Sequence, residues 1–170
     1  GGRHMDKRAL QGHLTNARSE LLDSIKDLSE AELIDLPVAG AWTIKDISAH
    51  IGGWAAWDLS SIEALQAGKH PDLSVIRDVD EFNRRLVASR KAWSMEDILD
   101  EMTTTQSALH AILADMPEAD VFRGSSFRGP YWSNLAEWLQ IACEHEEEHA
   151  AQIRAWRLSR QEPGAGPEAG

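Results

Sequence analysis

The helical character of the chain is clearest in residues 134–160, which read NLAEWLQIACEHEEEHAAQIRAWRLSR. Asn134 followed three residues later by Glu137 is typical of a helix start, because both side chains can accept hydrogen bonds from free backbone N–H groups. Side chains at intervals of three and four residues form one stripe: Leu135, Trp138, Ala142, His145, His149, Ile153 and Trp156. This spacing predicts a long amphipathic helix with two histidines on its inner face.

Three other stretches show the same period of apolar side chains, namely residues 6–28, 43–68 and 94–117. Shorter helices are predicted after Ser29, which forms a capping-box pattern with Glu32, and from Asp78 to about Lys91. Only residues 121–127 offer a weak strand pattern. We therefore predict an all-α fold, a four-helix up-and-down bundle with short extra helices in its connections.

The chain has 170 residues, a length typical of one domain. We expect residues 1–5 (GGRHM) to be a tag remnant, residues 6–160 to form the bundle and residues 161–170 to be a disordered tail. Cys143 is the only cysteine, which excludes an intramolecular disulfide. No apolar run reaches the roughly 20 residues that span a membrane. These features predict a cytoplasmic location.

The balance of charges excludes two classes of partner. The chain has 17 lysines and arginines against 28 aspartates and glutamates, so its net charge is −11 with neutral histidines. Proteins that bind nucleic acid or anionic membranes gain affinity by neutralising phosphates, which this chain would repel. We therefore expect neither nucleic acid nor membrane as a partner, which leaves a small-molecule substrate or a protein.

Three histidines are predicted to face the interior of the bundle. His145 and His149 lie one turn apart on the last helix, so both imidazoles can bind one metal ion. His50 lies between Ile47 and Trp54 on the inner face of the second long helix. A single inward histidine is usually an ordinary core residue, but burying three without a shared ligand would cost desolvation free energy three times. The pattern favours a three-histidine site for a divalent metal.

Residues 145–149 also spell H-E-x-x-H, the motif of zinc proteases. We discount this interpretation because the short remaining chain leaves little room for a further ligand. A metal with an open coordination position would lower the pKa of a bound water towards about 7. Glu146 and Glu148 flank the histidine face, where either can accept a proton or orient an imidazole, and a solvated helix face is the alternative. Trp54 lies one turn from His50 and is expected to line the substrate pocket.

Two segments resemble the DinB-like superfamily of four-helix bundles. They are residues 42–50 (WTIKDISAH) and residues 144–156 (EHEEEHAAQIRAW). The resemblance extends over about residues 7–158, and within the superfamily the chain looks closest to the branch grouped with the ClbS and DfsB proteins.

The resemblance implies specific roles for the residues in these segments. It implies a divalent metal, nickel or zinc, bound by His50, His145 and His149. The pattern of the branch favours Glu148 as the catalytic glutamate, whereas relatives often carry a tyrosine at the position of Glu146. Relatives commonly pair, so a homodimer is expected.

Three functions are consistent with these features. The favoured one is a metal-dependent enzyme that hydrolyses or detoxifies a small electrophilic substrate, such as a reactive natural product, as self-resistance proteins of this branch do. The first alternative is a thiol-cofactor-dependent transferase or isomerase, whose thiol carboxylate needs cationic side chains such as Arg123, Arg128 or Arg154. The second alternative is a non-catalytic bundle that binds and sequesters a small molecule.

Overall fold

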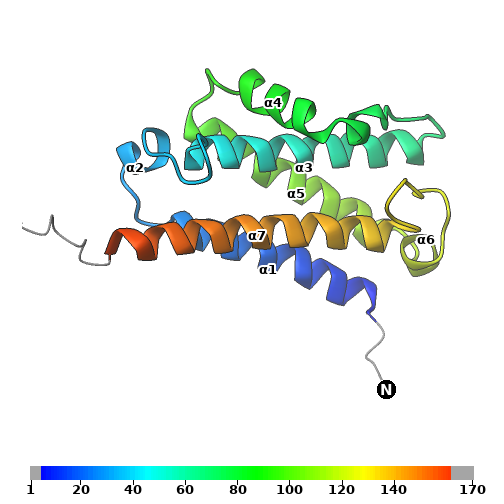
Figure 1. Cartoon of the computed structure of the whole chain (residues 1–170). Helices are drawn as coiled ribbons and strands as arrows, with labels where there is room; N and C mark the ends of the chain where they lie inside the picture. Colours follow the sequence, from blue (N-terminus) through cyan, green and yellow to red (C-terminus); the bar gives the residue numbers. More distant parts are fainter. Residues whose placement is uncertain (1–4, 162–170) are drawn as a thin grey trace, which may run out of the picture.

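The computed structural model describes residues 5–161, which form seven α-helices and one 3₁₀ turn, Ser74–Arg77. The helices in Figure 1 are α1 (Lys7–Ile25), α2 (Glu30–Ile34), α3 (Ile44–Gln66), α4 (Val79–Ser89), α5 (Met95–Asp115), α6 (Glu118–Phe122) and α7 (Leu135–Gln161). The predicted all-α four-helix bundle with short extra helices is confirmed. The predicted tag remnant and tail lie outside the described residues, apart from Met5 and Gln161.

The helices begin at the residues that the sequence pattern indicates. Thr43 Oγ1 accepts a hydrogen bond from Asp46 N at 3.1 Å, and Asp46 Oδ2 accepts one from Thr43 N at 3.1 Å. This reciprocal pair satisfies two N–H groups that have no partner inside α3. Side chains also cap the starts of α2, α5 and α7, at Ser29, Ser94 and Asn134.

The weak strand pattern at residues 121–127 does not produce a strand. Val121 is fully buried in the last turn of α6, and Asn134 Nδ2 donates to the Phe122 carbonyl at 2.9 Å. Within residues 5–161 the only β-type pairing is an isolated bridge between Ala39 and Trp42. The apolar side chains of residues 121–127 therefore serve the core through a short helix and a loop.

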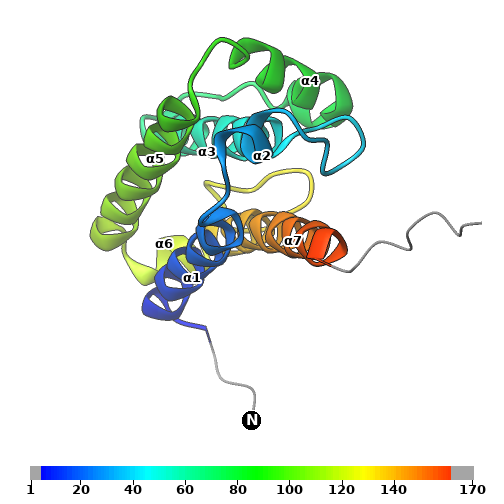
Figure 2. The ribbon, with the colours of Figure 1, turned by 90° about the vertical axis from the view of Figure 1, so that its left-hand side faces the viewer.

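The four long helices run up, down, down and up (Figures 1 and 2), so they do not follow the strict alternation of the predicted up-and-down arrangement. α1 and α7 are parallel neighbours, since Met5 contacts Gln140 near their starts and the Ser24 carbonyl accepts from Arg157 near their ends. α4 carries the chain back along the outside of α3, so α5 starts at the same end as α3 and runs parallel to it. As a consequence α7 is antiparallel to α3.

α4 packs closely on α3 because Gly53 leaves room for it. A Cβ atom placed on Gly53 would lie 2.7 Å from Cδ2 of Leu86, the buried leucine of α4. The absence of a side chain at Gly53 thus allows α4 to bring Asn83 towards the interior of the bundle, where it lines the same cavity as His50.

Two apolar clusters fill the bundle, one at each end. The cluster at the α6 end includes Leu10, Leu113 and Leu139, and the cluster at the α2 end includes Ile47 and Ile153. A cavity of about 650 Å³ lies between them and is bordered by α1, α3, α5 and α7. Within residues 5–161, no helix combines the length and apolar character needed to cross a membrane.

Candidate metal centre

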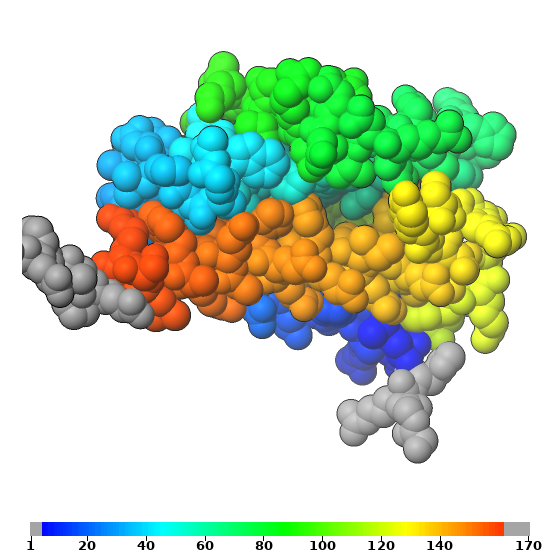
Figure 3. Space-filling view, in the orientation of Figure 1, coloured from blue at the N-terminus to red at the C-terminus, as the bar shows by residue number. Residues whose placement is uncertain are grey.

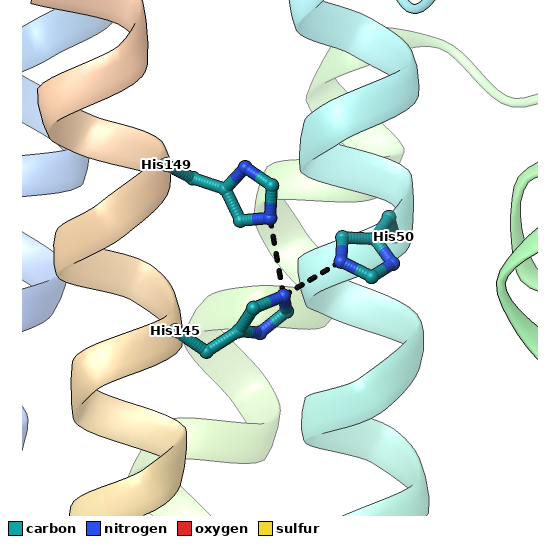
Figure 4. Close-up of side chains that lie close together, drawn as sticks. All are labelled: His50, His145 and His149. Atoms are coloured by element: carbon teal, nitrogen blue, oxygen red, sulfur yellow. Dashed lines mark hydrogen bonds between the residues drawn. The ribbon is translucent and has the colours of Figure 1, made fainter. Parts of the chain in front are cut away.

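The three histidines predicted to face inward converge on one point (Figure 4). His50 projects from α3, and His145 and His149 project from successive turns of α7. Nε2 of His145 lies 2.7 Å from Nε2 of His50 and 3.1 Å from Nε2 of His149. One ring nitrogen from each histidine lies within 4.8 Å of the others. The spacing of four residues on α7 and the antiparallel approach of α3 together produce this arrangement.

The surroundings keep the imidazoles of His50 and His145 neutral. Burial, reinforced by His145 and His149, lowers the pKa of His50 to about 3. Burial, reinforced by His149, lowers the pKa of His145 to about 4. At neutral pH these two rings therefore present lone pairs, which is the form in which histidine binds metals.

This donor set fits a divalent transition metal. The Nε2 atom of a neutral imidazole carries at most one hydrogen. His145 Nε2 lies close to both His50 Nε2 and His149 Nε2, so it cannot donate a hydrogen bond to both of them. A cation at the point of convergence would accept lone pairs from all three nitrogens. Imidazole is a preferred ligand of zinc and nickel, and three protein ligands are typical of sites that keep an open position.

The cavity extends from the histidines and reaches the surface. Trp54, predicted to line the substrate pocket, lies in its wall and donates through Nε1 to Oδ1 of Asn83 at 2.7 Å. In the space-filling view the surface is hollowed between α4, α7 and the loop that precedes α7 (Figure 3). The same three segments contribute Val79, Ile141 and Tyr131 to the cavity wall.

The two glutamates that flank the histidines have different surroundings. Glu148 is exposed on α7 and lines the cavity. Glu146 is largely buried and pairs with Arg18 of α1, whose Nη2 and Nε donate to its two carboxylate oxygens at 2.7 and 3.0 Å. Arg18 also donates to the Met102 carbonyl of α5 at 2.7 Å. The Arg18–Glu146 pair therefore joins α1, α5 and α7, whereas the carboxylate of Glu148 is accessible to solvent.

The cavity wall also contains a half-buried acid, Asp58, which the sequence pattern did not single out as a site residue. It lies two turns after His50 on the same face of α3, and its Oδ1 accepts a hydrogen bond from Trp138 Nε1 at 2.9 Å. Burial raises its pKa to about 7, opposed by the Trp138 hydrogen bond and reinforced by the negative charge of Glu146. An aspartate within an apolar stripe that already held a histidine was the available signal.

The remaining reactive side chains are placed as follows. Cys143 is buried, and burial together with nearby glutamates raises the pKa of its thiol to about 12, which makes it a poor nucleophile. Arg123, Arg128 and Arg154, all within the described residues, do not line the cavity. Arg154 instead donates to the Glu20 carbonyl on the α1 side of α7.

Solved structures share this fold at low sequence identity. A protein from Streptococcus pneumoniae has a TM-score of 0.79 at 12% identity, covering 92% of this chain and 93% of its own. The colibactin self-resistance protein ClbS, crystallised with dsDNA, has a TM-score of 0.78 at 10% identity, covering 92% and 98%. The sibling lethal factor precursor DfsB has a TM-score of 0.77 at 15% identity, covering 94% and 99%. No curated protein matches the sequence.

The sequence profile of one family covers most of the chain. It matches residues 13–153, a range that contains His50, His145, His149 and the cavity between the helices. The fold and the resemblance of the two histidine segments agree with this match. The chain belongs to the DinB superfamily.

Proposed function

We propose that this protein is a metal-dependent enzyme that hydrolyses or detoxifies a small electrophilic substrate, such as a reactive natural product, and thereby confers self-resistance. The proposal depends on one observation, the convergence of His50, His145 and His149 beside a cavity of about 650 Å³. This volume is within the range of small-molecule sites in proteins. A three-nitrogen site that opens on such a cavity combines metal chemistry with room for a substrate.

The side chains around the cavity have complementary roles in this proposal. A nickel or zinc ion held by His50, His145 and His149 would act as a Lewis acid that activates water near neutral pH. Glu148 accepts a proton at its exposed carboxylate on the α7 wall. Trp54, held by its hydrogen bond to Asn83, offers an indole face against which a flat or apolar substrate can pack. The apolar wall limits the access of water to the substrate.

Elemental analysis tests the metal site directly. Wild type and His149→Ala are reloaded with nickel or zinc after removal of any affinity tag, because a histidine tag would itself bind metal. We expect about one ion per chain in wild type and a large loss in His149→Ala. His110→Ala is the matched control, since His110 lies on α5 outside the cluster and should leave the metal content unchanged. Equal metal content in wild type and His149→Ala would contradict the proposal.

Turnover separates the proposal from its two alternatives. An enzyme consumes a molar excess of a reactive substrate, whereas a sequestering bundle removes one equivalent. A thiol-dependent transferase requires an added low-molecular-weight thiol. Loss of one equivalent only, without a thiol requirement, would favour sequestration and contradict the enzymatic proposal.

We propose a small molecule, and not DNA, as the partner of this cavity. The crystal of ClbS contains dsDNA, but the net charge of −11 in this chain opposes phosphate binding. We expect duplex DNA to bind only weakly at low salt, and we expect substitutions in the cavity to leave that weak binding unchanged.

The cytoplasmic location and the homodimer stay predictions. Sedimentation near 19 kDa at micromolar concentration would contradict the dimer.

A further inference from the structure

We propose that the part of the cavity around Asp58 binds a cationic group of the ligand, such as a protonated or quaternary amine. The site consists of the Asp58 carboxylate with Trp57 and Trp138 beside it, and we call it the Asp58 pocket. The inference deepens the proposed function and rests on it for the role of the cavity as the substrate site. The binding step itself requires no metal.

The Asp58 carboxylate lacks a counter-ion inside the protein. Its hydrogen bond comes from the neutral indole of Trp138, at 2.9 Å. Among residues 5–161, no lysine, arginine or histidine forms an ion pair with it. The residue is half-buried in the cavity wall, and the loss of water around a carboxylate without a cation is costly, which raises its pKa to about 7. A cationic ligand would remove this cost by pairing with the ionised form.

The cavity as a whole favours positive charge. Its wall contains four acidic side chains: Asp58, Glu144, Glu146 and Glu148. Among the described residues that line it, Arg18 is the only lysine or arginine, and its guanidinium is occupied by Glu146. A cleft lined by charges of one sign concentrates counter-ions, so the field in this cavity attracts cations.

Indole rings border the carboxylate. The rings of Trp57 and Trp138 have centroids 5.9 Å apart and are tilted by 51°. Trp132 stacks on Trp138 with centroids 4.8 Å apart. The faces of indole rings attract cations, most strongly those of amines that shed their water easily. A carboxylate beside tryptophans in a cavity is a common way to recognise an ammonium group, and a neutral ligand would gain only the apolar contact.

The distance from the metal centre limits the shape of the ligand. Asp58 follows His50 by eight residues on one helix, which corresponds to about 12 Å along α3. A ligand that reaches both sites is therefore an elongated molecule. Its electrophilic group and its ammonium group are separated by about this length.

Choline and its uncharged isostere 3,3-dimethylbutan-1-ol test the charge requirement, because the two probes have the same shape. Binding is followed by the ¹H–¹⁵N resonance of the Trp138 indole, whose N–H contacts Asp58. We expect wild type to bind choline at least tenfold more tightly than the isostere. Asp58→Asn keeps an oxygen for Trp138 and should abolish this preference. Equal affinity of wild type for both probes, or an unchanged preference in Asp58→Asn, would overturn the inference.

Two further variants keep the test decisive. Trp57→Leu should lower the affinity for choline more than that for the isostere, and it provides the answer if Asp58→Asn does not fold. His149→Ala should bind choline as wild type does, because the Asp58 pocket needs no metal. If His149→Ala keeps both its metal and its choline binding, the proposed function fails and the inference stands. If choline binding fails while His149→Ala loses metal, the inference alone fails.

Discussion

The buried histidines predict that the metal-free protein loses stability as the pH falls, with a defined share due to His50. The pKa of His50 is about 3 and that of His145 about 4 in the folded protein, against about 6.5 in an unfolded chain. Above pH 6.5 both states hold these rings neutral, and the effect is absent. Below pH 6.5 the unfolded chain takes up protons that the folded protein refuses until the pH nears 4 and 3. The free energy of unfolding therefore decreases over this window.

The size of this change in stability follows from the difference between the pH and the pKa of histidine in the unfolded chain. A pH of 5 is about 1.5 units below the pKa of histidine in the unfolded chain. Protonation of the unfolded state at His50 alone therefore lowers the free energy of unfolding by about 2 kcal/mol. His145 contributes a similar loss. Asp58 acts with the opposite sign, because its pKa of about 7 lets the folded protein take up a proton that the unfolded chain refuses. This gain of about 2 kcal/mol at pH 5 offsets about half of the roughly 4 kcal/mol lost through the two histidines, so the net loss of wild type does not reveal the share due to His50.

A comparison of variants isolates the contribution of His50. His50→Gln removes the titrating ring, and His70→Gln is a control that removes an exposed histidine from the connection between α3 and α4. Urea denaturation in EDTA, at pH 7 and pH 5, measures the free energy of unfolding of each protein. Between these values we expect His50→Gln to lose about 2 kcal/mol less stability than wild type and His70→Gln. Equal losses in all three proteins would refute the reasoning that burial keeps His50 neutral.

Three other substitutions or treatments test the packing described above. Arg18→Met should destabilise the protein by about 3–5 kcal/mol in urea denaturation, because it leaves the Glu146 carboxylate buried without its partner. The double variant Arg18→Met with Glu146→Gln should lose less stability, and a loss equal to that of Arg18→Met would contradict this cause. Gly53→Ala should cost about 1–3 kcal/mol by forcing Leu86 away, and a melting temperature equal to that of wild type would count against the close approach of α4. Cys143 should react with a thiol reagent only as fast as the protein unfolds, and rapid labelling of the native protein would contradict its buried environment.

The helix starts and the inward histidines were predictable because they depend on short-range pattern. A capping box places its two partners three residues apart, so Thr43 with Asp46 announces the start of α3 without any tertiary information. The inner face of a helix follows from the period of its apolar residues. His50, His145 and His149 stand on such faces, which is why their meeting could be anticipated before the helices were placed in space.

The polar contacts between helices depend on register, which a single sequence does not reveal. Arg18 follows Ala17 at the edge of the apolar stripe of α1, but nothing near it in the chain indicates that Glu146 is its partner. Asp58 has its partner Trp138 eighty residues away. The only signal was a charged residue within an apolar stripe, for Asp58, or at its edge, for Arg18, and such a residue can equally mark the border of a solvated face.

The direction of the helices explains why the two ends of the cavity belong to one site. In a pair of antiparallel helices, a step forward along one helix reaches the same height as an equal step backward along the other. His50 is level with His145, and eight residues later along α3 Asp58 meets Trp138, seven residues earlier on α7. Both contacts therefore arise from a single register of α3 and α7. In strict alternation of the four long helices α3 and α7 would be parallel, and the residue eight positions after His145, Ile153, would stand level with Asp58. The return of the chain through α4 is thus the step that joins the histidines and the Asp58 pocket in one cavity.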